Sequence, residues 1–416
     1  MKIKCLLLIA LCISYNIKTQ CQTSLSLKDA FDLAKKNNPF YNAEKYNTDL
    51  SKADLTTAKL QLNPSFGASY TQVTSPKYFM ENTSALNAAN RQLSFQVGKT
   101  FQVHGQRKYK IQSAEHELTL SQSNLNEYER NLLAEVANKW LEIWYEDQKL
   151  KILKLAKENS DSLIKINQVR LKNEVITKTE FMRTEILDDQ YRLLLINAQQ
   201  DYKSSINELS FMLGTTDNFN INDNEASFSI PLINQYDSIV NYALNKRTDI
   251  KVNNEMKEKA KIDIQLQKAM AYPQPEVGIN YSTQNQVPYV GAFLNISLPT
   301  YDRNQGEIEK ANITLKQSES MQNATVNKVK NEIQTSWNEY ITYKNSYEKY
   351  KEIFQKSENV LKTVRLSYLK GGTTILDFLE AERNWFDLQN QYNEAFYNYK
   401  KAYIDLLYVS NLIQNI

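Results

Sequence analysis

Residues that interrupt helices are scarce in this sequence. Of 416 residues, 9 are glycine and 8 are proline, about 2% each, whereas an average globular chain has about 7% and 5%. Neither residue occurs in four stretches, 106–213, 232–272, 307–370 and 373–416. Folds that need a Gly-rich turn every few dozen residues, such as the Rossmann fold and the TIM barrel, are therefore disfavoured. Since 42% of the residues are hydrophobic, disorder is disfavoured too, and very long helices are predicted.

Cysteine is absent from the body of the chain, because all three cysteines lie within residues 1–22: Cys5, Cys12 and Cys21. In this segment Lys2 and Lys4 precede the apolar run 5–13, which is typical of a signal peptide and too short to cross a bilayer. An anchoring helix is the alternative, but polar residues follow the run at once. Cys21 is a candidate lipidation site, although the residues before it are not the small and aliphatic ones that such a site favours. The mature protein then has no disulfide and no thiolate site.

A large excess of charge of one sign is also missing. The formal net charge is +3, and the first 22 residues contain three lysines and no acid, so the remainder has 50 − 3 = 47 basic and 47 acidic residues. Nucleic acid is therefore not expected as a partner, because phosphate binding needs a basic excess or a basic face. His104 and His116 are the only histidines, and neither has a second histidine or a cysteine at ligand spacing. We expect no catalytic residue, no metal ligand and no cofactor.

The body of the chain is internally duplicated. Segment 63–70 matches segment 274–281 at an offset of 211. Four later residues match at an offset of 197, namely Glu135 with Glu332, Trp140 with Trp337, Phe181 with Phe378, and Glu185 with Glu382. Two copies of this length indicate two equivalent halves. We predict a first repeat over 23–213, a linker over 214–236 and a second repeat over 237–416.

Each repeat has the same predicted layout of a helix, two short strands, a very long helix and a closing helix. The helices are predicted at 27–62, 107–172 and 177–213, and at 237–272, 305–369 and 374–412. The strands are predicted at 65–73, 92–101, 276–284 and 289–299, where apolar and polar residues alternate. About nine to eleven residues is the length of a tilted membrane-spanning strand. The alternation alone suits a small sheet lying on a helical core equally well.

The long helices are polar and carry a narrow apolar seam, in which residues such as Leu132, Val136 and Trp140 recur three and four apart. At 1.5 Å per residue, a helix of about 65 residues is about 100 Å long. No apolar run beyond residue 22 approaches the roughly 18 residues of a membrane helix. Four strands cannot close a membrane barrel, and narrow seams need partner helices. Both features predict a closed ring of identical chains.

Three segments resemble the TolC family of outer-membrane efflux channels: the opening 24–39, the strand exit 297–308 and the turn 368–381. The similarity covers essentially all of the mature chain. It implies a mainly α-helical fold with short β-strands, in which three chains contribute four strands each to a twelve-stranded outer-membrane β-barrel. Their helices would continue the barrel as a tunnel across the periplasm. Segment 301–306 most resembles the branch that serves heavy-metal cation pumps.

The resemblance also implies partners. These are a homotrimer, the lipid of the outer membrane of a Gram-negative bacterium, a periplasmic adaptor (membrane fusion) protein and an inner-membrane RND or ABC transporter. The predicted function is that of a passive exit duct, not an enzyme: the outer membrane channel of a tripartite efflux pump or a type I secretion system, with heavy-metal cations or drugs as candidate cargo. The alternative is a secreted periplasmic or surface coiled-coil protein with a structural or adhesive role, whose sheets lie outside any membrane.

Charged residues near the predicted turns gain a role from the resemblance. Asp377 and Glu380 lie three apart and share a helix face, and the matching acidic pair in the family lines the periplasmic aperture and favours cations. The equivalent residues of the first repeat are Glu180 and Arg183. From the residues alone, an acidic helix start favoured by the helix dipole explains them equally well. As a hypothesis, Arg183 pairs with Glu380 and holds the aperture closed.

The two turns between long and closing helices are where the family docks its adaptor. The glycine pair of the second turn permits a tight reversal, whereas the first turn has no glycine and is expected to be of a different kind. A plain structural turn is the alternative at both places. The candidate docking residues are Lys172, Asn173, Glu174, Gly371 and Gly372.

Overall fold

The computed structural model describes residues 23–216, 219–221 and 235–416. The predicted signal peptide, including Cys21, lies outside the described residues. So do residues 217–218 and 222–234 of the predicted linker.

The described residues form two compact units. The first, here called the helical unit, contains the described residues of 23–42, 129–243 and 330–416, and the second, here called the sheet unit, contains 43–128 and 244–329. Each unit therefore combines segments from both predicted repeats.

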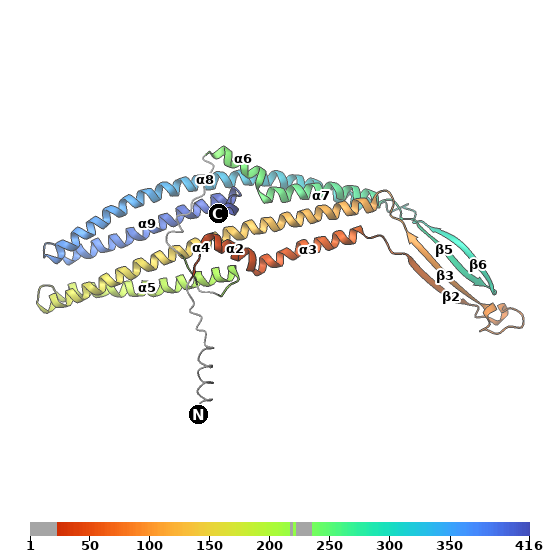
Figure 1. The fold of residues 1–416 in the computed structure, drawn as a ribbon, viewed down its shortest axis with the longest axis horizontal. Helices are drawn as coiled ribbons and strands as arrows, with labels where there is room; N and C mark the ends of the chain where they lie inside the picture. Colours follow the sequence, from red (N-terminus) through yellow and green to blue (C-terminus); the bar gives the residue numbers. More distant parts are fainter. Residues whose placement is uncertain (1–22, 217–218, 222–234) are drawn as a thin grey trace, which may run out of the picture. The chain divides into compact units, whose positions relative to one another are not determined.

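Helices dominate the described chain (Figure 1). The first half contains α2 (Leu27–Asn37), α3 (Pro39–Lys59), α4 (Gln106–Lys172) and α5 (Lys178–Leu213). The second half contains α6 (Tyr236–Lys246), α7 (Thr248–Met270), α8 (Gln305–Leu369) and α9 (Ile375–Val409). The long and closing helices begin and end within three residues of the predicted positions. None of the described helices is long and apolar enough to cross a membrane.

The first helix of each half is interrupted, so the two single helices predicted at 27–62 and 237–272 are wrong. At Asn38 the backbone is extended, with ψ of 122°, because the following proline disfavours the helical conformation of the residue before it. The Asn38 side chain then accepts a hydrogen bond from Tyr41 N at 2.8 Å. The second break falls at Arg247, with ψ of 134°. No glycine or proline lies near this residue to predict it.

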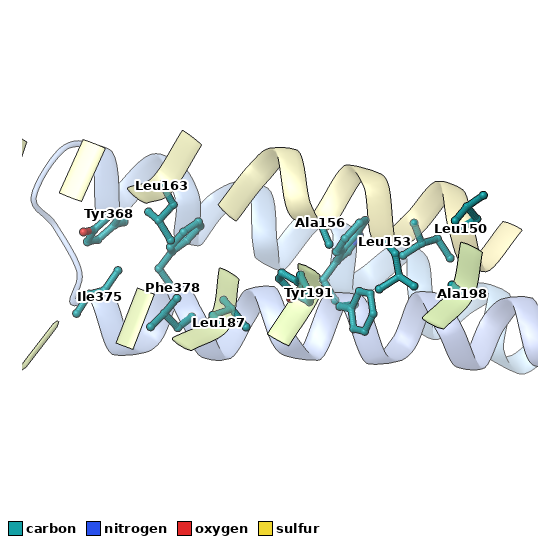
Figure 2. Packing of buried hydrophobic residues seen from close by; sticks show 14 residues of the cluster. Leu150, Leu153, Ala156, Leu163, Leu187, Tyr191, Ala198, Tyr368, Ile375 and Phe378 are labelled. Carbon is teal, nitrogen blue, oxygen red and sulfur yellow. The ribbon is translucent and has the colours of Figure 1, made fainter. Parts of the chain in front are cut away.

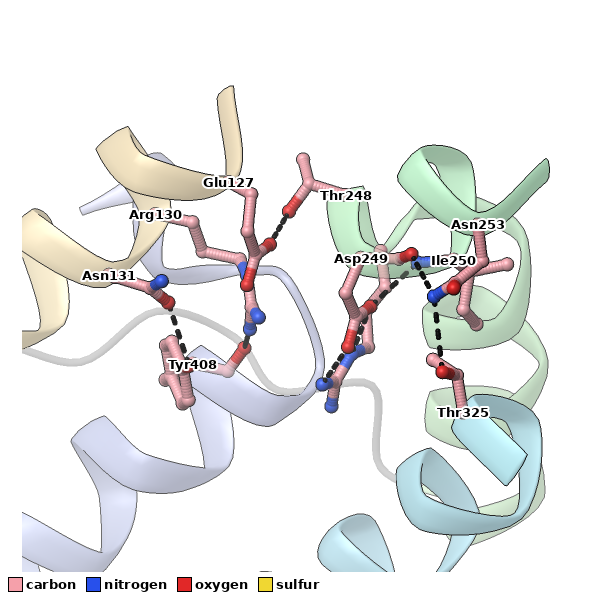
Figure 3. Close-up of polar contacts among 10 residues, drawn as sticks. Glu127, Arg130, Asn131, Thr248, Asp249, Ile250, Asn253, Thr325 and Tyr408 are labelled. Carbon is pink, nitrogen blue, oxygen red and sulfur yellow. Dashed lines mark hydrogen bonds and ion pairs between the residues drawn. The ribbon is translucent and has the colours of Figure 1, made fainter. Parts of the chain in front are cut away.

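Polar side chains stabilise the chain near these breaks, within each unit separately (Figure 3). In the sheet unit the Thr248 hydroxyl donates to Glu127, and Asn253 Nδ2 donates to Thr325 Oγ1 at 3.1 Å. In the helical unit the Arg130 guanidinium donates to the carbonyl oxygen of Tyr408 at 2.9 Å. These bonds connect helices that are more than 70 residues apart in the sequence.

One antiparallel sheet lies in the sheet unit, with the strand order β2–β3–β5–β6. Its strands are β2 (Ser65–Gln72), β3 (Arg91–Thr100), β5 (Glu276–Gln284) and β6 (Val287–Asn295). β3 and β5 come from different halves of the sequence, and their pairing joins the two hairpins, with Val97 opposite Ile279. Asn285 and Gln286 both have positive φ in the turn from β5 to β6, as tight hairpin turns require.

β6 differs from its prediction because it ends at Asn295 instead of residue 299. Asn295 pairs with Glu276, the first residue of β5. Pro275 precedes that strand and has no N–H group to donate to a longer ladder. Residues 296–299 therefore leave the sheet although they continue the apolar alternation.

The helical unit contains a small parallel sheet that was not predicted. β1 (Thr23–Ser24) pairs with β4 (Phe219–Asn220), and Leu25 N donates to the carbonyl oxygen of Asn220 at 2.8 Å. The Leu25 carbonyl in turn accepts a hydrogen bond from the indole nitrogen of Trp140 at 3.0 Å. The start of the described chain thus covers the most deeply buried tryptophan.

Apolar side chains of α4, α5, α8 and α9 form the core of the helical unit toward the two turns (Figure 2). Leu153 and Leu163 come from α4, Leu187 and Tyr191 from α5, and Phe378 from α9. The seam predicted on α4 is confirmed at Leu132, Val136 and Trp140, all of which are buried. Burial of this seam explains why helices of such polar composition stay together.

Candidate functional site

The four-stranded sheet has one apolar face. Residues directly opposite each other on paired strands share a face, and the register gathers these side chains on one of them: Phe66, Ala68, Tyr70, Leu93, Phe95, Val97, Val277, Ile279, Tyr281, Val290, Ala292 and Leu294. The larger ones are mostly exposed, for example Ile279 at 64% and Val290 at 80%. An exposed apolar band of this kind fits contact with lipid.

The opposite face of the sheet is mostly polar or small. It carries Ser65, Gly67, Ser69, Ser94, Gln96, Gly98, Glu276, Gly278, Asn280, Ser282, Gly291, Phe293 and Asn295. Glu276 accepts hydrogen bonds from the Ser65 hydroxyl at 2.9 Å and from Asn295 Nδ2 at 3.3 Å. The Phe293 ring lies directly over Gly278, where a Cβ atom would overlap both this ring and the carbonyl oxygen of Val97.

The two outer strands of the sheet, β2 and β6, each pair on one side only. Their remaining backbone N–H and C=O groups form open edges of the four-stranded sheet. Lipid offers no hydrogen-bonding partners for the backbone N–H and C=O groups of an open edge. A sheet that enters a membrane therefore needs a partner strand at each of its edges.

The two turns of the helical unit, between α4 and α5 and between α8 and α9, follow the same backbone path. Val175 N donates to the carbonyl oxygen of Arg170 at 2.9 Å, and Gly372 N to that of Ser367 at 2.8 Å, which are equivalent positions 197 residues apart. This bond is the outer one of the motif that commonly ends a helix.

The same motif needs one residue in the left-handed backbone conformation, and the two turns use different residue types at that position. Gly371 has φ of 79° and Glu174 has φ of 57°. The expectation that Lys172, Asn173 and Glu174 form a different kind of turn is wrong, because Glu174 takes the conformation that glycine takes in the other turn. All five candidate docking residues are exposed in the single chain.

Both closing helices begin with a capping box built on a candidate aperture residue. Glu180 accepts hydrogen bonds from Thr177 N at 2.7 Å and from the Thr177 hydroxyl at 2.9 Å. Asp377 accepts from Thr374 N at 3.1 Å and from the Thr373 and Thr374 hydroxyls at 2.6 and 2.7 Å. The bond from the Thr177 backbone lowers the pKa of Glu180, and the bond from the Thr373 hydroxyl lowers that of Asp377. Both carboxylates are therefore ionised at neutral pH and stabilise their helix starts.

The other two candidate aperture residues, Glu380 and Arg183, are exposed on the second turns of α9 and α5. No ion pair joins these two described residues within one chain. With Asp377 and Glu180, the four side chains give three carboxylates and one guanidinium, a net of two negative charges per chain.

A contact that the sequence did not suggest connects the two turns. The Arg170 guanidinium, near the end of α4, donates to the carbonyl oxygen of Tyr368 at 3.1 Å and lies 4.3 Å from the centre of the Tyr368 ring. The Tyr368 hydroxyl donates to Asn167 Oδ1 at 2.6 Å, and Asn167 Nδ2 donates to the Thr184 hydroxyl at 3.0 Å. Asn167 and Thr184 are fully buried, so this group ties α4, α5 and α8 together beneath the turns.

Within the part of the chain that the structure describes, no three histidine, cysteine or acidic side chains converge to form a metal site. The candidate functional features described above are surfaces: the two sheet faces, the sheet edges and the acidic turns.

Comparison with known proteins gives a family and several related folds. The family model described as outer membrane efflux protein matches residues 30–215 and 239–411. Several solved structures share the fold at low sequence identity, and three of them are described here. The channel CusC aligns over 95% of this chain and 95% of its own, with a TM-score of 0.77 and 15% identity.

Two further channels come from named pathogens. The outer membrane protein VceC of Vibrio cholerae aligns over 92% of this chain and 95% of its own, with a TM-score of 0.73 and 16% identity. The open state of the MtrE outer membrane channel of Neisseria gonorrhoeae aligns over 92% of this chain and 88% of its own, with a TM-score of 0.74 and 15% identity. No curated protein sequence matches this chain.

The family match covers most of both repeats, and the fold similarity extends over nearly the whole chain. The resemblance to TolC-like channels is thereby confirmed, as are the mainly α-helical fold with a four-stranded sheet and the location in the outer membrane. Members of this family are channel proteins, not enzymes. The chain belongs to the outer membrane efflux protein family.

Proposed function

We propose that this outer membrane efflux channel works as a homotrimeric exit duct of a tripartite pump. In this proposal the sheets of three chains close one barrel, edge β2 of each chain pairing with edge β6 of the next. The helices continue the passage into the periplasm, where an adaptor protein connects it to an inner-membrane transporter. A type I secretion system is the alternative setting for the same duct.

The observation that carries the proposal is the sheet, which combines one exposed apolar face, one polar face and two open edges. An apolar outer face and a polar inner face are what a water-filled membrane barrel requires. A soluble sheet would instead bury its apolar face against other elements. Heavy-metal cations are the proposed cargo, and the only support is that segment 301–306 resembles the branch of the family that serves heavy-metal cation pumps.

The test is purification from outer membranes, chemical cross-linking and conductance in a planar bilayer. We expect a cross-linked trimer and discrete channel openings. A monomer in the soluble fraction, or a trimer that never conducts, would contradict the proposal.

Neutralising the acidic turn is expected to weaken cation preference. In Glu380→Gln combined with Asp377→Asn, each chain loses two negative charges, so a ring of six carboxylates around the proposed aperture would vanish. The reversal potential in a salt gradient should move toward the unselective value. Glu380→Gln alone should give part of the shift, because the Asp377 carboxylate remains, and this single variant also keeps the Asp377 cap on the start of α9. Asp54→Asn, an exposed acid on α3 in the other unit, is the control, and equal shifts in both variants would refute the assignment.

The turns and the groove beside them are the proposed adaptor surface. Leu187, Leu193 and Leu194 of α5 and Phe386 of α9 line an open groove, and Leu193 is 61% exposed. Such a half-apolar groove between helices suits a helical partner. The candidate docking residues lie at the same end of the helical unit, in the turns from α4 to α5 and from α8 to α9: Lys172, Asn173, Glu174, Gly371 and Gly372.

Replacing Gly371 with valine is expected to abolish adaptor binding while trimers persist. The left-handed φ of 79° is strongly disfavoured for a β-branched residue, so the turn must change shape, although a Cβ atom at this position would meet no neighbour. Gly372→Ala is the matched control, because a Cβ there makes only an ordinary contact, 3.5 Å from the carbonyl oxygen of Ser367. Pull-down of the adaptor with each variant measures the effect. Loss of the trimer in Gly371→Val would point to a folding role instead.

A further inference from the structure

Glu382 is a buried carboxyl group in the third turn of α9. Only 3% of the residue is exposed, and its Oε2 atom is buried without a hydrogen-bonding partner in the protein. The apolar residues Phe378 and Trp385 lie four positions before and three after it, and both belong to the core of the helical unit. A carboxyl group in such a place is tolerated when it is neutral and is costly when it is ionised.

A small cavity adjoins Glu382. Its volume is about 50 Å³, and its lining includes Asn159 and Ser162 of α4, Arg365 and Tyr368 of α8, and Glu382 itself. The lining is part polar and part apolar, and a cavity of this size has room for a few water molecules beside its polar groups. Arg365 is otherwise exposed to solvent, so its guanidinium can reach the cavity from outside.

The charged and titratable groups that face Glu382 come from each neighbouring helix. α8 provides Arg365 and Tyr368, and the Tyr368 hydroxyl is already bonded to Asn167. α5 provides Tyr191, whose hydroxyl is likewise buried without a partner; burial raises the pKa of Tyr191, and the nearby Glu382 raises it further. α4 provides only the uncharged Asn159 and Ser162. Arg365 is thus the one cation among the groups lining this cavity.

We propose that Glu382 is a proton-controlled latch on the start of α9. When the carboxyl is neutral, it stays in the core and α9 remains packed against α4 and α8. When it is ionised, it turns into the cavity toward water and the Arg365 guanidinium, and the first turns of α9 loosen. These turns carry Asp377 and Glu380, so the latch would act on the segment assigned above to the aperture.

The direction of the pH effect follows from burial. Burial raises the pKa of Glu382 to about 7, and Arg365 lowers it only in part. Because the folded pKa lies above that of an exposed glutamate, the packed form is fully stable below about pH 4.5 and loses stability as the pH rises through about 7. The latch therefore holds in mildly acidic solution and releases in mildly alkaline solution.

Hydrogen exchange of the purified full-length protein tests the latch without any need for conduction. After correction for the intrinsic pH dependence, peptides covering the first turns of α9 should open about tenfold more often at pH 8 than at pH 6. Glu382→Gln should abolish this difference. Glu185→Gln, the equivalent but exposed position on α5, should leave it unchanged. Equal protection at both pH values in the unaltered protein, or an undiminished difference in Glu382→Gln, would overturn the latch.

A second variant, Arg365→Gln, tests the latch even if Glu382→Gln fails to fold. Arg365→Gln removes the cation that favours the ionised carboxyl, so the midpoint of the exchange transition should move to higher pH. An unchanged midpoint would refute the role of Arg365 and, with it, the latch. The inference assumes the proposed duct only for its effect on the aperture. A protein that never conducts but shows this exchange pattern would contradict the duct and leave the latch intact.

Discussion

Gly278→Val is expected to abolish assembly in the outer membrane almost completely. Gly278 lies on β5 opposite Gly98 of β3, and a Cβ atom there would overlap the carbonyl oxygen of Val97 and the ring of Phe293. Inserting side-chain atoms into a well-packed site costs about 1–3 kcal/mol when the surroundings can relax. Here the obstacle includes the backbone of the paired strand, so relief requires breaking the ladder that joins the two hairpins.

Fractionation of cells that express the variant measures this loss, as the share of protein recovered in assembled, membrane-embedded form. Gly67→Ala is the control on the same face, because its Cβ would meet only the flexible side chain of Gln96. It should assemble nearly as well as the unaltered protein. Normal assembly of Gly278→Val would mean that the β3–β5 ladder does not join the hairpins as described.

Trp140→Ala is the second change with a large expected effect, about 3–5 kcal/mol of lost stability. Trp140 is fully buried, and its removal leaves a cavity in the helical unit and an unpaired carbonyl group at Leu25. Thermal unfolding monitored by circular dichroism should show a markedly lower transition temperature.

The repeat provides a matched control for this prediction. Trp337 is the equivalent tryptophan of the second half, but it is only partly buried and touches Tyr236 and Tyr340 at ring distances of 6.4 and 6.3 Å. Trp337→Ala should therefore destabilise the single chain much less. Similar losses in the two variants would show that Trp337 is buried by another chain in the assembled protein.

Much of the fold could be predicted because its determinants are local. The absence of glycine and proline from 106–213 and 307–370 predicted long helices in these stretches, and α4, α5 and α8 confirm them. The break at Arg247 could not be predicted, since no residue there disfavours a helix. At the break the Arg247 guanidinium forms an ion pair of 2.6 Å with Asp249, which the sequence pattern did not indicate.

The site was predictable in part for the same reason. Charge patterning located the acidic turns, but it could not show that Asp377 and Glu180 also cap their helices, or that Arg170 contacts Tyr368 across nearly 200 residues. Glu382 did leave a signal, because it falls on the face of α9 that Phe378 and Trp385 place in the core. An acidic residue on the apolar face of a predicted helix can be found from the sequence, and its burial can then be tested.

The open edges β2 and β6 have a genetic consequence. In the proposed trimer every chain supplies one partner to each neighbour, so a chain with an intact β6 and a defective β2 would enter the ring and leave it unclosed. With equal amounts of normal and defective chains, about one trimer in eight would contain normal chains only. Mutations at one sheet edge should therefore behave as dominant alleles, whereas mutations that prevent folding altogether should be recessive.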